Sequence, residues 1–178
     1  DEIQGGIGRT GKIFAYKHYG VSPDIITSAK GLGSGIPIGA TIVKKEISKK
    51  INIGFHGSTF GGGMLQTRVA YNVFKTINKT RFLNNVKSKG VLLEQLLNKL
   101  HSKHDVIKEV RIKGLMAGIE FKNSKLALKI YKETSNHGLV TTLVKGTTIR
   151  ITPPLIIKSE EIKRGIKIIS GCLDKIKN

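Results

Sequence analysis

Two short segments near the start of the chain carry residue types that could do chemistry together. Asp1-Glu2-Ile3-Gln4 supplies carboxylate and amide groups, and Lys30 stands in the small-residue run Ser28–Gly33. A lysine at the end of a buried strand has a desolvated amine, which favours the neutral nucleophile. Pyridoxal phosphate needs such a lysine to hold its aldehyde as a Schiff base, and a carboxylate to keep its ring nitrogen protonated. Because the chain has 25 lysines, this pairing alone is a weak argument.

The glycine-rich segment 6–11 matches two phosphate-binding patterns only in part. As G-x-G-x-x-G it lacks a preceding strand, and the nearest downstream acid, Asp24, directly follows a proline. A dinucleotide site needs that strand, and an acid for the ribose. As a P-loop, the segment continues with Lys12 and Ile13, where a Ser or Thr should bind magnesium. We therefore interpret this segment as a turn whose backbone packs closely against another part of the protein.

The formal net charge of +19 raises the question of nucleic-acid binding. The cations are spread along the whole chain, and only six are Arg, the residue that phosphate and base recognition favours. This distribution predicts weak, salt-sensitive adhesion and no specific nucleic-acid site.

Further classes of protein are excluded by single features of the sequence. The one cysteine, Cys172, allows no internal disulfide and is typical of a reducing compartment, so we expect a cytoplasmic protein or one of an organelle. No run approaches the ~20 apolar residues of a membrane span. The histidines have no supporting cluster of Cys or carboxylates, so we predict no metal site.

The elements that must position Asp1–Gln4 and Lys30 are short strands joined by glycine-rich loops. β-branched runs bounded by Gly and Pro predict buried strands over 24–27 and 38–43. From Met64 the apolar residues recur every four positions, which predicts a helix over 64–77. A second apolar stripe, from Phe82 to Leu100, predicts another helix.

The rest of the chain predicts a β-α-β-β-α lobe after that long helix, with two strand-like runs before its first helix. Strands are predicted over 106–112, 115–121, 139–144 and 147–151. A helix over 124–136 should stop at His137-Gly138, and Ser159-Glu160-Glu161 should open the last helix with acids at its positive end. The predicted class is therefore α/β in two lobes, with a boundary near 78–80.

Three ordered motifs resemble the class III (ornithine-type) aminotransferases. They are DEIQGGIGRTGKIFAYKHYGVSPDIITSAKGLGSGIPIGA over 1–40, GFHGSTFGG over 54–62 and TTIRITPPLII over 147–157. Within the class, the chain is most similar to the acetylornithine branch. The resemblance covers essentially all 178 residues and implies the fold-type-I architecture of pyridoxal-phosphate transferases. Residues 1–77 would be the C-terminal part of the large cofactor domain, and 78–178 the C-terminal small domain.

The resemblance implies a role for each residue of the first motif that matches the family. Lys30 would carry pyridoxal 5'-phosphate as a Schiff base and move the proton between the substrate Cα and the cofactor. Asp1 would bond the pyridine nitrogen, and Gln4 the phenolic oxygen. Ile3 would pack on the ring face, although an ordinary core role for Ile3 is equally consistent with the sequence.

The other two motifs imply contacts with phosphate and with substrate. Ser58 and Thr59 match phosphate contacts that reach the neighbouring subunit, which implies a homodimer with shared sites; the alternative is a simple N-cap for the helix from Met64. Arg150 matches the arginine that clamps a substrate carboxylate, for which a planar guanidinium is suited. The alternative for Arg150 is a surface salt bridge.

The implied reaction is ping-pong transfer of an amino group from N-acetylornithine, or a related ω-amino donor, to 2-oxoglutarate. Other readings remain open: an ornithine, 4-aminobutyrate or aminoadipate-type transaminase, an aminomutase, or a non-catalytic assembly module. In relatives, the region before the match to Asp1 supplies further pocket residues, so we expect these 178 residues alone to be inactive or nearly so.

Overall fold

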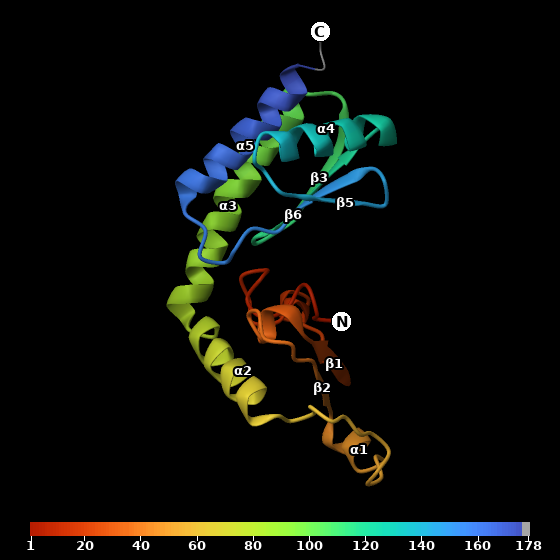
Figure 1. Ribbon diagram of the computed structural model, residues 1–178. Helices are drawn as coiled ribbons and strands as arrows, with labels where there is room; N and C mark the ends of the chain where they lie inside the picture. The colour runs from red at the N-terminus through yellow and green to blue at the C-terminus, as the bar shows by residue number, and fades with distance from the viewer. Residues whose placement is uncertain (176–178) are drawn as a thin grey trace. The chain divides into compact units, whose positions relative to one another are not determined.

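The computed structural model describes residues 1–175 and separates into two compact units, Asp1–Asn84 and Asn85–Asn178 (Figure 1). The division falls inside α3 (Thr80–Lys103), a few residues after the predicted boundary. The last three residues of the predicted small domain, 176–178, lie outside the described residues. Each unit is described separately below.

The first unit is built from short elements and one longer helix. In chain order these are η1 (Ala15–His18), β1 (Ile25–Ser28), η2 (Lys30–Leu32), β2 (Ala40–Val43), α1 (Lys45–Ser48) and α2 (Met64–Ile77). β1 and β2 pair antiparallel, from Ile25 opposite Val43 to Ser28 opposite Ala40.

The prediction that both strands of the first unit are buried is wrong for this chain. Ile25 is 52% exposed and Ile42 is 47% exposed. The reason is that β1 and β2 form a two-stranded sheet, with no third strand pairing to it among residues 1–175. Such a ribbon leaves much of both faces open.

The second unit is an antiparallel sheet with helices packed on it. Its elements after α3 are β3 (Ile107–Lys113), β4 (Met116–Phe121), α4 (Ser124–Asn136), β5 (Thr142–Val144), β6 (Thr148–Ile151) and α5 (Ser159–Asp174). The strand order is β3-β4-β6-β5, and α4 lies against the sheet with α5 beside it (Figure 1). All four predicted strands are present, although β5 starts three residues later than expected. The α/β class is confirmed.

Alternation along β4 divides the sheet into a buried face and an open face. Ala117, Ile119 and Phe121 are buried, whereas Met116, Gly118 and Glu120 point to the other side and are partly exposed. The buried face joins apolar side chains from the helices, among them Val86, Leu93, Leu97 and Leu100 of α3, Ile130 of α4 and Ile169 of α5. The second unit therefore has its own hydrophobic core.

Local chemistry at the helix ends follows the predicted signals. His137 is the C-cap of α4, and Gly138 follows in the left-handed region at φ +78°. At the start of α5 the Glu161 carboxylate accepts the backbone N–H of Lys158 at 2.7 Å. Within residues 1–175, no helix is both long and apolar enough to cross a membrane.

Candidate active site

The segment that carries Asp1, Ile3 and Gln4 is hydrogen-bonded to the strand that leads to Lys30. The N–H of Glu2 donates to the carbonyl of Thr27 at 2.8 Å, and Thr27 lies in β1, three residues before Lys30. The Asp1 carboxylate accepts the N–H of Ile3 at 2.8 Å, which fixes the Asp1 side chain relative to the backbone. The structure therefore brings the two parts of the first motif together.

Lys30 sits in a strained backbone conformation directly after β1. Its φ of +46° lies in the left-handed region, which costs a non-glycine residue about 1–2 kcal/mol. The Lys30 carbonyl accepts the N–H groups of Gly33 and Ser34, which closes the short turn of η2. Strain of this kind persists where the surroundings enforce it and is concentrated at functional sites. The Lys30 side chain is exposed, so the expectation of a desolvated amine is wrong for this chain, because the two-stranded sheet that precedes it does not cover it.

A second strained residue supports the turn that carries Lys30. Ile7 has φ +49° and is 2% exposed, although a β-branched residue rarely adopts this conformation. A Cβ placed on Gly31 would lie 3.4 Å from the Ile7 Cβ, so the turn packs directly on Ile7. The glycine-rich segment thus acts as predicted, as a turn whose backbone packs closely against another part of the protein.

The sequence analysis missed Ser28, which ends β1. Ser28 is 3% exposed, and its Oγ is buried without a hydrogen-bond partner among residues 1–175. A buried hydroxyl without a partner costs about 1–3 kcal/mol. Ser28 thus adds a buried hydroxyl, two residues before Lys30, to the Asp1 carboxylate, the Gln4 amide and the Lys30 amine, whose chemistry suits a polar heteroaromatic cofactor. The residues present fit pyridoxal phosphate.

Ser58 and Thr59 lie in the exposed loop between α1 and α2. Ser58 lines a hollow of about 430 Å³ together with Pro37, Ile38 and Gly39, and neither Lys30 nor the segment 1–4 lines it. The alternative of an N-cap is wrong, because the N-cap of α2 is Gly63 and no side chain caps that helix.

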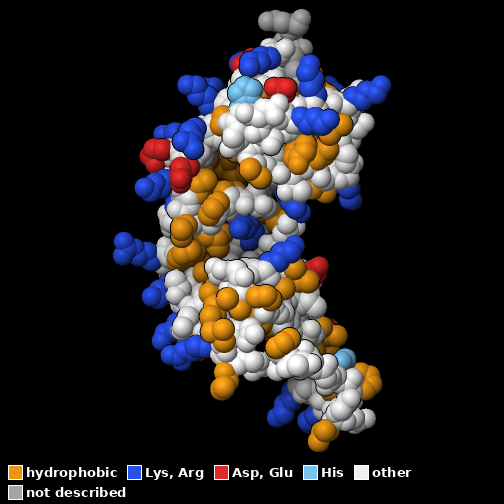
Figure 2. All heavy atoms as spheres, viewed as in Figure 1, with side chains coloured by type: hydrophobic (Ala, Val, Ile, Leu, Met, Phe, Trp, Pro, Cys, Tyr) orange, Lys and Arg blue, Asp and Glu red, His pale blue; other side chains and the backbone are white. Residues whose placement is uncertain are grey.

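Hydrophobic side chains close in sequence to Ser58 and Thr59 are exposed, and Figure 2 shows that exposed hydrophobic side chains are frequent in this view of the chain. Phe55 and Phe60 are more than two-thirds exposed, and Met64 at the start of α2 is 89% exposed. Exposed apolar side chains of this size are typical of a surface that another chain or another part of the protein covers.

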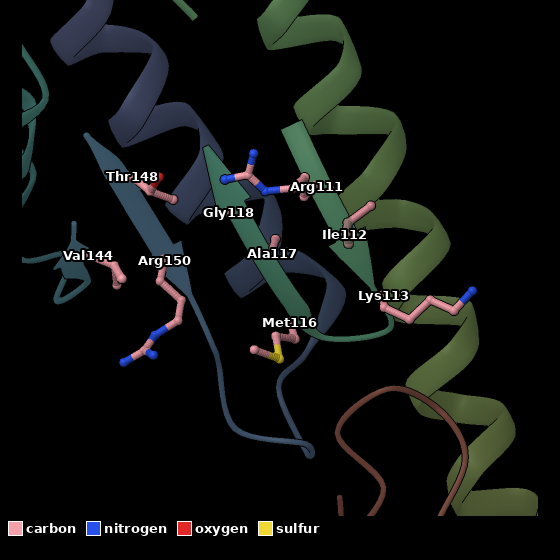
Figure 3. A pocket seen from close by; sticks show the side chains of 9 residues that line it. All are labelled: Arg111, Ile112, Lys113, Met116, Ala117, Gly118, Val144, Thr148 and Arg150. Atoms are coloured by element: carbon pink, nitrogen blue, oxygen red, sulfur yellow. The ribbon is translucent and has the colours of Figure 1, made fainter. Parts of the chain in front are cut away.

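Arg150 belongs to the second unit, where it lies on the open face of the sheet, and the other predicted site residues belong to the first unit. Its backbone is opposite Gly118 on β4, and Gly118 is in turn opposite Arg111 on β3. The three residues line a hollow of about 320 Å³ with Thr148 of β6. In Figure 3 the Arg111 side chain reaches over β4 toward Gly118, and a Cβ built on Gly118 would lie 3.2 Å from the Thr148 Cγ2.

The two arginines of this hollow have different surroundings. Arg111 is bonded to both Glu109 and Glu120, and Lys108 donates to Glu120 at 2.7 Å. Hydrogen bonds from Lys108 and Arg111 lower the pKa of Glu120. Glu109 and Glu120 are directly opposite one another, so Arg111 offsets the repulsion of a like-charged cross-strand pair. Arg111 is thus neutralised by its neighbours.

No group of three His, Cys, Asp or Glu side chains with metal-binding geometry occurs in the part of the chain that the structure describes. Cys172 is buried on α5, and burial raises the pKa of its thiol. Neither observation adds a second chemical centre to the candidate site.

Comparison with known proteins gives a match over nearly the whole chain. The model of the aminotransferase class-III family matches residues 1–173. The acetylornithine aminotransferase of Caldanaerobacter subterraneus subsp. tengcongensis is 45% identical over 177 residues, which cover 99% of this chain and 44% of the relative. The succinylornithine transaminase of Yersinia pseudotuberculosis is 38% identical, over 99% of this chain and 43% of the relative.

A solved structure agrees with these relatives. The ornithine delta-aminotransferase of Plasmodium falciparum matches with a TM-score of 0.91 and 35% identity, over 98% of this chain and 45% of that chain. The predicted fold-type-I architecture is therefore confirmed. The chain spans less than half the length of the proteins it matches.

Proposed function

The chain belongs to the class III aminotransferase family, whose cofactor is pyridoxal phosphate. From this premise we propose that the chain is part of a transaminase. The proposed reaction moves an amino group from N-acetylornithine, or a related ω-amino donor, to 2-oxoglutarate by a ping-pong mechanism. The observation that carries the proposal is the hydrogen bond that joins Asp1–Gln4 to β1, beside Lys30. Residues 1–77 would be the C-terminal part of the large domain, and residues 78–178 the small domain.

The roles of the residues in the first unit follow from their chemistry. When bound, pyridoxal phosphate supplies an electron sink for the bond that breaks at the substrate Cα. Lys30 would hold the cofactor through Nζ. Its free amine would move the proton between the substrate Cα and the cofactor. The Asp1 carboxylate keeps a proton on the ring nitrogen, and the Gln4 amide donates to the ring oxygen. Ile3, which is half-buried, covers the ring face and excludes water.

We propose that Ser58 and Thr59 bind the phosphate of the cofactor held by a second copy of the chain. The exposed apolar side chains around them support this proposal, because a homodimer would bury Phe55, Phe60 and Met64. Hydroxyls near the start of a helix suit a dianion. Sedimentation equilibrium tests the dimer: a monomer at all concentrations would contradict it.

We propose that Arg150 binds the carboxylate of the substrate. Its place in the hollow, which Gly118 and Thr148 also line, supports this role. A planar guanidinium binds that group through two parallel hydrogen bonds. Arg111 does not compete for the carboxylate, because Glu109 and Glu120 already occupy it.

The test of the proposed function is the site of covalent cofactor attachment. The 178-residue chain is mixed with less than one equivalent of pyridoxal phosphate, reduced with borohydride and digested, and the modified lysine is located by mass spectrometry. Since 25 lysines compete, preferential labelling of Lys30 supports the assignment. Lys30→Ala should abolish the specific adduct, whereas Lys49→Ala, which removes an exposed lysine in the same unit, should not. An equal adduct in Lys30→Ala would show that the assignment is wrong.

The amino donor is tested separately from cofactor binding. Ornithine, 4-aminobutyrate and aminoadipate-type donors are the nearest rivals to N-acetylornithine, and a substrate panel on the protein with a complete site separates them. A non-catalytic assembly module is the rival from another class. Equilibrium dialysis distinguishes it, because a module of this kind would show no detectable cofactor binding.

A further inference from the structure

Glu2 lies inside the segment of proposed cofactor contacts, yet its side chain is buried and bonded to backbone. The residue is 5% exposed. Its two carboxylate oxygens accept the N–H groups of Ala15 and Tyr16, each at 2.8 Å. Its own N–H donates to Thr27 at 2.8 Å. One residue therefore joins three stretches of chain: the segment 1–4, the turn η1 and the strand β1.

The backbone around Glu2 is fixed on both sides by short contacts. The Asp1 carboxylate accepts the N–H of Ile3 across Glu2, and the Glu2 carbonyl accepts the N–H of Gly6 at 3.0 Å. A Cβ on Gly6 would lie 2.5 Å from the Glu2 carbonyl oxygen, so even a methyl group does not fit there. Asp1 and Ile3 flank a residue with little room to move, and their orientation depends on it.

We propose that Glu2 is a positioning residue: its buried carboxylate orients Asp1 and Ile3 toward the cofactor and holds them at a fixed place beside the strand that carries Lys30. This inference rests on the proposed function. We call the three hydrogen bonds of Glu2, to Ala15, Tyr16 and Thr27, the Glu2 tether.

The tether requires a carboxylate of this length. A buried carboxylate is stable only when hydrogen-bond donors surround it, and here two backbone N–H groups point at its two oxygens. Gln in this place would turn an NH₂ group toward one of those N–H donors, which leaves a buried donor unpaired. Asp would be one methylene short of η1. Both substitutions keep a polar side chain and change only the reach or the acceptors.

The experiment compares Glu2→Gln with Glu46→Gln, which removes the charge of an exposed glutamate on α1 in the same unit. Hydrogen exchange at the amides of Ala15 and Tyr16 reports the tether without any cofactor. Absorbance titration gives the Kd for pyridoxal phosphate. The bound cofactor has a visible absorbance band, and its position and pH profile report the contact between the Asp1 carboxylate and the ring nitrogen.

In Glu2→Gln we expect faster exchange at both amides, a Kd for pyridoxal phosphate weakened about tenfold, and a shifted pH profile of the visible band. Glu46→Gln should match the unsubstituted chain in all three. Glu2→Asp, which keeps the charge, should show the same changes because it cannot reach η1, and it gives a second test should Glu2→Gln fold poorly.

The outcomes separate this inference from the proposed function. If exchange quickens in Glu2→Gln while the Kd and the band stay as in Glu46→Gln, Glu2 is only structural and the inference is wrong. If hydrogen exchange at the amides of Ala15 and Tyr16 is unchanged in Glu2→Gln, the Glu2 carboxylate does not hold these amides and the Glu2 tether is refuted. If the protein with a complete site forms no adduct at Lys30, the proposed function fails, and the positioning role fails with it.

Discussion

Gly90 of α3 lies against the turn between β3 and β4, and replacing it by alanine tests the packing of the second unit. A Cβ on Gly90 would lie 2.7 Å from the Cα of Gly114, and 2.8 and 2.9 Å from its carbonyl oxygen and carbon. Carbon atoms pack at about 3.5–4.0 Å, so the methyl group would be roughly 1 Å too close to backbone on the facing turn.

The expected change in stability follows from two opposing effects. Overpacking typically costs about 1–3 kcal/mol, and the upper end applies because backbone atoms cannot rotate out of the way. Alanine gains about 1 kcal/mol over glycine in helix propensity. We therefore expect Gly90→Ala to lower the free energy of unfolding by about 2 kcal/mol.

Urea unfolding followed by circular dichroism measures this change. Gly165→Ala is the matched control, because Gly165 is also within a helix, α5, and its new Cβ would meet only the Leu139 Cδ1 at an ordinary 3.5 Å. Gly165→Ala should raise the free energy of unfolding by about 0.5–1 kcal/mol. If Gly90→Ala stabilised the chain as Gly165→Ala does, the close approach of α3 to the turn would be refuted.

Three further predictions concern strain, charge and reactivity. Lys30→Gly should raise the free energy of unfolding by about 1 kcal/mol, since glycine adopts φ +46° without cost, while Lys30→Ala should not; equal denaturation midpoints for the two would contradict the strain. Because Lys108 and Arg111 lower the pKa of Glu120, its contribution to stability is complete above the ordinary pKa of glutamate and is lost as pH falls through the lowered value. Acid titration of Glu120→Gln should thus show a smaller loss of stability than Glu94→Gln, an exposed glutamate on α3. Cys172 should react slowly with a thiol reagent at neutral pH and quickly after denaturation, because burial raises its pKa; fast labelling of the native chain would show that α5 does not cover it.

The elements could be predicted from the sequence wherever the determinants are local. The α4 helix begins at the Asn123 cap and ends at His137 before Gly138, and both signals are visible in the residues themselves. The period-two pattern of β4 likewise separates buried Ile119 from Glu120 on the other face. Burial of β1 and β2 was overestimated, because burial depends on what lies next to a strand and not on the strand alone.

The candidate site could be predicted only in part, for the same reason. Asp1, Gln4 and Lys30 stand out through their residue types and a family resemblance. Glu2 does not, because its role depends on the amides of Ala15 and Tyr16, more than ten residues away. The pairing of Arg111 with Glu120 depends on the register between β3 and β4, which no pattern within one strand determines.

The left-handed conformation of Lys30 has a consequence for how sequences descended from this one would change. At that position the proposed chemistry and the conformational preference favour different residues: the first requires an amine, the second glycine or asparagine. A lineage that no longer needed the reaction would gain stability by a substitution of Lys30 to glycine. The backbone conformation would then not favour a return to lysine. Retention of lysine among diverging copies would therefore itself be a record of continued use.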